Sequence, residues 1–195
     1  MEIAVTVYEK MKTNAKGNFT NSDLFKENGG HITKNHRIRF NYIKDNNATF
    51  QEYFLKFHNK PYDNYSSMTI DNCDFIIRHE NIAEDYLLAL NKAGVETPFS
   101  LPVVNKTAGK KNDLSEYYTK DIRRQTIYIF GPFLAKYNYC FPENWGDINI
   151  PLSSTIKFKI MSVLRRANER FVKKHPIRKS ILGTIYGKIQ RKEAS

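Results

Sequence analysis

The residues best suited to chemistry lie in one polar loop in the middle of the chain. Three lysines, Lys106, Lys110 and Lys111, are interleaved there with Thr107 and Gly109. Ammonium groups, a hydroxyl and backbone N–H groups at this spacing can converge on a phosphate, each satisfying part of its charge. The same composition also fits a solvated basic loop with no ligand. The loop by itself leaves both interpretations open.

Histidines are the candidates for a general base, because an imidazole titrates near neutrality. His31 and His36 lie in the Asn- and Gly-rich region 13–47, where an acceptor could bind. They are weak catalytic candidates, since no motif places them. His58 is expected at the surface. No Cys/His cluster has the spacing of a zinc site, so no metal is predicted.

Apolar periodicity predicts the elements that must position these residues. Region 13–47 is expected to hold only short helices, and 73–78 is a run of strand-formers. In the helix that follows this strand, the residues expected to face inward are Ile82, Tyr86, Leu87 and Leu90. Trp145 is expected to close a core. The predicted helices are 1–12, 49–60, 82–93, 119–135 and 153–174.

The basic character of the chain is concentrated at one end. The formal net charge is +11, and residues 151–195 hold 12 of the 31 lysines and arginines but 2 of the 20 acidic residues. We therefore expect two parts, a domain at 1–150 and a basic amphipathic helical tail at 151–195. The tail either docks on the domain through its apolar face, lies on an anionic membrane surface, or binds nucleic acid, which is ranked last.

Targeting signals are not evident in the chain as written. The first ten residues lack the basic and apolar regions of a secretory signal, and no apolar run reaches about 18 residues. A cytoplasmic location is expected, with membrane association through residues 151–195 as the alternative.

Three stretches together resemble the carbohydrate branch of the sulfotransferase superfamily. The run FIIRHENIAEDY, starting at Phe75, is similar to that family's strand followed by an acidic helix start. The motif LP-x-x-N-x-T, which starts at Leu101 and is followed by Tyr117-Tyr118, is similar to the loop that contacts the donor's 3′-phosphate in that family. The opening MEIAVTVY matches the end of a donor-binding motif, with Glu2 at the acidic position and Thr6 at the family's serine. The motif's arginine has no counterpart.

The resemblance implies an α/β, P-loop-like domain with a parallel sheet, incomplete at its N-terminus, followed by basic helices. It implies transfer of a sulfuryl group from 3′-phosphoadenosine 5′-phosphosulfate (PAPS) to a hydroxyl, with a carbohydrate as acceptor. The 3′-phosphate side of the donor would be bound by Thr6, Lys106, Thr107, Lys110 and Lys111. Catalysis is expected to be feeble, because the loop that cradles the transferred group has no counterpart here. The alternative is a noncatalytic nucleotide- or glycan-binding module.

Overall fold

A computed structural model provides the structure, and the chain divides into two compact units. The larger unit comprises Met1–Asp63 and Thr107–Ser195, and the smaller unit comprises Asn64–Lys106. The residues that the structure describes are 1–64, 69–70, 73–95, 101, 107–111 and 113–168.

The described part of the chain is helical, and the prediction of an α/β fold with a parallel sheet is wrong. Its only β contact is an isolated bridge between Phe25 and Ile32. Residues 73–78, the predicted strand, are irregular, and Ile76 and Ile77 in this run are exposed. Strand propensity is realised only when a neighbouring strand takes up the backbone N–H and C=O groups. The described residues offer this run no such neighbour.

The first helix agrees with its sequence pattern. Helix α1 spans Glu2–Thr13 and ends at Asn14, which adopts the left-handed conformation (φ 44°) and donates its N–H to the carbonyl of Lys10. Such a residue ends a helix by satisfying one of its last carbonyls. One face of α1 is buried, including Val5 and Tyr8.

The Asn-rich region holds a longer helix than predicted. Helix α2 spans Lys34–Asp45 and is capped by Thr33 through a capping box in which His36 takes the third position. The usual signature of this cap has Glu or Gln there, so the sequence pattern did not show it. The short helices η1 (Ser22–Leu24) and η2 (Lys26–Asn28) precede α2.

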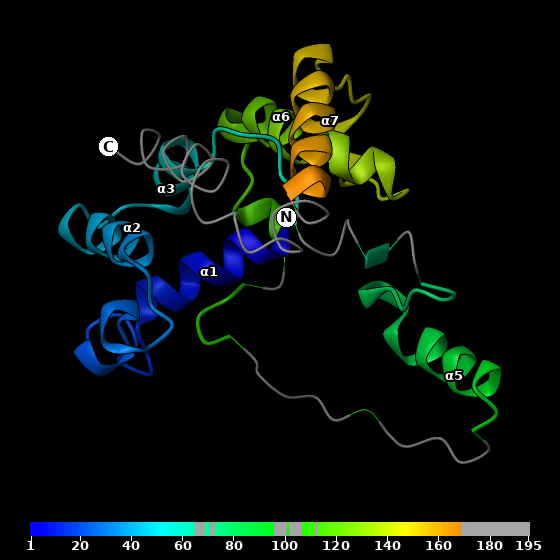
Figure 1. Cartoon of the computed structure of the whole chain (residues 1–195). Coiled ribbons are helices and arrows are strands. Elements are labelled where there is room, and N and C mark those ends of the chain that lie inside the picture. Colours follow the sequence, from blue (N-terminus) through cyan, green and yellow to red (C-terminus); the bar gives the residue numbers. More distant parts are fainter. Residues whose placement is uncertain (65–68, 71–72, 96–100, 102–106, 112, 169–195) are drawn as a thin grey trace. The chain divides into compact units, whose positions relative to one another are not determined.

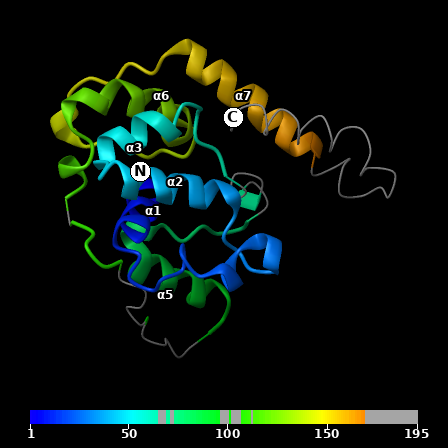
Figure 2. The same ribbon diagram turned by 90° about the vertical axis from the view of Figure 1, so that its left-hand side faces the viewer.

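An aromatic core joins helices α1, α3 and α6 of the larger unit. Figures 1 and 2 show the backbone of these three helices. Helix α3 spans Phe50–Phe57 and begins with a Thr49/Glu52 capping box, which confirms the predicted helix start. Helix α6 spans Lys120–Lys136. Trp145, in the short helix η6 (Glu143–Trp145), is buried as expected. The large side chains that are almost fully buried include Tyr8, Tyr53, Phe54, Tyr118 and Phe130.

Helix α7, Leu152–Ala167, packs against α6 through its less apolar face. Phe158 and Ser154 are buried, and the Ser154 hydroxyl donates to the carbonyl of Tyr128. Docking on the domain through the apolar face was one of three alternatives for the tail, but the part of that face on α7, which includes Ile156 and Ile160, is exposed. None of the described helices is long and apolar enough to cross a membrane.

The smaller unit contains helix α5, Ile82–Lys92, preceded by η4, His79–Asn81. The Arg78 N–H donates to the Asp85 carboxylate at 2.8 Å, which ties the chain before η4 to the first turn of α5. None of the α5 side chains is buried, so the prediction that Ile82 and Leu87 face a core is wrong.

Candidate functional site

The lysine loop lies along helix α1. The Nζ atom of Lys110 lies 3.1 Å from Oε2 of Glu2, in the first turn of the helix. Gly109 has φ +76°, and a Cβ atom built on it would lie 3.2 Å from both a Glu9 carboxylate oxygen and a Thr13 methyl. Positive φ and a close helix both favour glycine at this point. The backbone of the loop is therefore held against the helix.

The helix residues that meet the loop form one stripe. Glu2, Glu9 and Thr13 are separated by seven and four residues, which are near-integral numbers of helical turns. Thr6 lies four residues after Glu2 and so falls on the same stripe. Its side chain is half-buried. Thr6 and the lysine loop, more than a hundred residues apart in sequence, share this side of α1.

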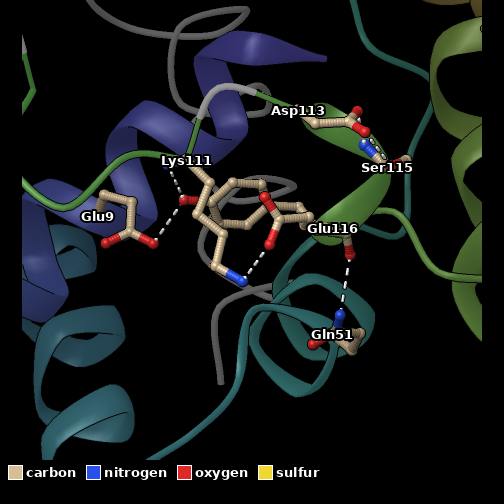
Figure 3. A network of polar contacts seen from close by, with 7 residues as sticks. Glu9, Gln51, Lys111, Asp113, Ser115 and Glu116 are labelled. Carbon is tan, nitrogen blue, oxygen red and sulfur yellow. Dashed lines mark hydrogen bonds and ion pairs between the residues drawn. The ribbon is translucent and has the colours of Figure 1, made fainter.

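A buried polar network anchors the end of the loop (Figure 3). The Tyr117 hydroxyl donates to Oε1 of Glu9 at 2.9 Å and accepts from the backbone N–H of Lys111 at 2.9 Å. Burial raises the pKa of Tyr117, and its bond to Glu9 raises it further. The carbonyl of Tyr117 accepts from the Gln51 side chain at 3.0 Å, which fixes the tyrosine from its backbone as well.

Both described lysines of the loop already have acidic partners. Besides the Lys110–Glu2 pair, the Nζ atom of Lys111 lies 2.5 Å from Oε2 of Glu116, in η5 (Leu114–Glu116). Glu9 adds a third carboxylate and is 5% exposed. A phosphate entering here must therefore displace carboxylates rather than fill an empty cationic pocket. The lysine–glutamate pairs are half-exposed, and such pairs contribute only about 0–1 kcal/mol.

The structure gathers most of the predicted donor-site residues and leaves the candidate bases elsewhere. Thr6 lies on the α1 stripe, Lys110 and Lys111 lie beside it, and Thr107 precedes them in the same loop, whereas Lys106 lies outside the described residues. The hydrogen bonds of His36 belong to the start of α2, and His31 precedes that helix.

The two candidate bases differ in their surroundings. Nδ1 of His36 accepts from the Thr33 N–H at 3.3 Å as part of the α2 capping box. Burial lowers the pKa of His36, and the nearby charges of Arg39 and His31 lower it further. His31 is exposed. The capping bond gives His36 a structural role, and a catalytic role for either histidine stays a prediction.

No family model, curated protein or solved structure matches this chain. The resemblance to sulfotransferases therefore stays a prediction that rests on the residues quoted for it. In the part of the chain that the structure describes, no three His, Cys, Asp or Glu side chains are grouped as a metal site would need.

Sequence reasoning missed the two residues that organise the site, Glu9 and Tyr117. Glu9 could have been found from its register, since it continues the stripe of Glu2 and Thr6 by one further turn. Tyr117 belongs to the YY pair quoted for the resemblance, but its bond to Glu9 could not be read from the sequence, because the two residues are 108 positions apart.

His58 was expected at the surface, and this prediction is wrong. Its ring stacks on Phe54, with centroids 4.9 Å apart, and lies 5.5 Å from the Tyr53 ring. Its Nε2 atom is buried without a hydrogen-bond partner among the described residues. Burial, reinforced by the charge of Arg39, lowers its pKa to about 4. His58 is therefore held neutral in the folded protein.

Proposed function

We propose that this chain binds the 3′-phosphate side of a PAPS-type nucleotide between Thr6 of α1 and the loop 107–111. The observation that carries the proposal is the position of Lys110, whose ammonium lies 3.1 Å from Glu2, one helical turn before Thr6. The resemblance implies that α1 and the loop both contact the same group of the nucleotide, its 3′-phosphate. Their meeting in the fold supports that assignment independently of the quoted motifs.

The energies permit a phosphate to replace the glutamates. Each lysine–glutamate pair contributes about 0–1 kcal/mol, so exchanging Glu2 or Glu116 for a phosphate costs little. A phosphate monoester carries a charge of about −1.5 to −2, so it attracts an ammonium group more strongly than a carboxylate does. The Lys110 side chain is 23% exposed, and solvent screens its interaction with either partner alike.

Sulfuryl transfer to a carbohydrate hydroxyl is the second step of the proposal. An in-line displacement at sulfur needs a base for the acceptor hydroxyl and cationic donors for the leaving oxygen. The residues gathered on α1 are assigned to the 3′-phosphate, remote from the transferred group. Nucleotide binding without efficient transfer is therefore the activity that we expect from this chain alone.

Calorimetric titration with adenosine 3′,5′-bisphosphate tests the proposed site. The double variant Lys110→Ala/Lys111→Ala is expected to bind roughly tenfold to a hundredfold more weakly, because two charge-assisted contacts are lost. The control Lys16→Ala/Lys26→Ala makes the same change of net charge at exposed positions elsewhere. Measurement at two salt concentrations separates a site from diffuse attraction. Equal weakening by both double variants, or no saturable binding by the folded chain, would contradict the proposal.

Neutralising Glu2 is expected to have the opposite effect. The variant Glu2→Gln frees the Lys110 ammonium from its partner, so the affinity for the bisphosphate should rise by up to about fivefold. Glu84→Gln on α5 is the matched control, since it removes one exposed carboxylate from the other unit. A loss of affinity in Glu2→Gln would mean that the ion pair positions Lys110 rather than competing for it.

A further inference from the structure

The outward face of helix α7 is an apolar stripe with nothing described against it. Its five members recur at spacings of three and four residues and therefore share one side of the helix. Ile160, near the middle of the stripe, is 55% exposed. The exposed fractions of the other four are 74% for Leu152, 49% for Ile156, 64% for Val163 and 57% for Leu164.

Among the described residues, α7 is held in place from the side opposite the stripe. Phe158 is buried against the unit, and Arg165 forms an ion pair at 3.2 Å with Asp63, whose side chain is fully buried. The Ser162 hydroxyl also donates to the Asp63 carboxylate, at 3.2 Å. The stripe is thus presented outward by a helix that is fixed in orientation.

Basic side chains flank the stripe on both sides. From Ile156, Lys157 is displaced by roughly 100° around the helix in one direction and Lys159 by roughly 60° in the other. Arg166 lies near Lys159, and all three are exposed. Helix α7 carries no acidic residue. Apolar side chains flanked by one cation on one side and two on the other are complementary to an anionic lipid surface, with acyl chains beneath phosphates.

We propose that α7 lies in the surface of an anionic lipid bilayer, with its stripe among the upper acyl chains and Lys157, Lys159 and Arg166 at the level of the phosphates. A second copy of the chain fits the stripe less well. Two α7 helices packed stripe to stripe would bring their basic flanks together, with no acidic residue on either helix to compensate.

Flotation of the full chain with vesicles tests this proposal. We expect binding to phosphatidylcholine vesicles containing 30% phosphatidylserine and weak binding to pure phosphatidylcholine. Ile160→Glu should lower the partition coefficient by at least about tenfold, because it places a carboxylate in the apolar layer. Leu55→Glu is the matched control, since Leu55 is 50% exposed on α3, and it should bind like the unmodified chain.

The cationic flanks are tested separately. Lys157→Gln/Lys159→Gln should weaken binding by roughly fivefold per lysine, and Lys16→Gln/Lys26→Gln should weaken it much less. Residues 169–195 are identical in all variants, so the differences report on α7. If Ile160→Glu binds the vesicles as tightly as the unmodified chain, general charge attraction explains the binding and the proposal is overturned. The proposal would also be overturned if the unmodified chain sediments as a dimer and Ile160→Glu sediments as a monomer, because a second copy of the chain would then cover the stripe.

Discussion

Replacing Phe50 with alanine is expected to lower the free energy of unfolding by about 3–5 kcal/mol, the usual cost of removing a buried phenyl ring. Phe50 is 3% exposed and stands at the centre of the aromatic core. Domains of this size are stable by about 5–15 kcal/mol in total, so the loss is a large part of the whole. The rings within 6.4 Å of Phe50 belong to Tyr8, Tyr53, Phe54, Tyr117 and Tyr118.

Urea unfolding followed by circular dichroism measures this effect. Leu55→Ala, five residues along the same helix, is the control, and it should cost less than about 1 kcal/mol because that side chain is half exposed. Phe50→Leu should recover part of the loss, since it refills most of the cavity. If Phe50→Ala and Leu55→Ala lower the free energy of unfolding by the same amount, the core does not centre on the Phe50 ring.

Acidification is expected to destabilise the protein through His58. In the folded state the pKa of His58 is lowered from 6.5 to about 4, mainly by burial. Between these values the unfolded chain binds a proton that the folded chain excludes, so stability falls as pH drops from about 6.5 to about 4. At about 1.4 kcal/mol per pKa unit, the loss at pH 4.5 relative to pH 7 is roughly 2–3 kcal/mol. Above pH 6.5 both states are neutral at this residue and the effect vanishes.

The comparison of variants isolates this histidine from other titrating groups. His58→Leu and His58→Gln cannot titrate, so the difference in stability between pH 7 and pH 4.5 should shrink by the same 2–3 kcal/mol in both. His31→Gln, at an exposed histidine, should keep the full pH dependence. An unchanged pH profile in both His58 variants would show that other groups cause the acid sensitivity.

Local signals predicted most of the helices correctly. The Thr49 cap, with an apolar face behind it, marked α3, and Thr119 marked the start of α6. These features depend on residues three or four positions apart, which the sequence displays directly. Helix α2 was missed because His36 completes its cap in place of the usual Glu. The run 73–78 has the composition of a strand, but strand formation depends on a partner that local sequence does not specify.

Only part of the candidate site could be predicted from the sequence. The loop lysines and Thr6 could be named from residue type and resemblance, and the fold brings Lys110 to the helix of Thr6. That Lys110 already has a glutamate partner could not be foreseen, since Glu2 and Lys110 are 108 residues apart. This pairing changes the expected electrostatics from an open cationic pocket to one in which a phosphate competes with carboxylates.

The sequence by itself determined most of the helical segments, with α2 the exception, and the concentration of positive charge in the C-terminal region, because these follow from composition and short-range spacing. The tertiary structure alone decided which face of each element is covered. It packed the half-buried ring of His58 against Phe54 and Tyr53, and it turned the most apolar stripe of α7 outward while Phe158 took the inner side. A helix with two usable faces buries the one that its neighbours complement, and that choice depends on contacts far apart in the chain.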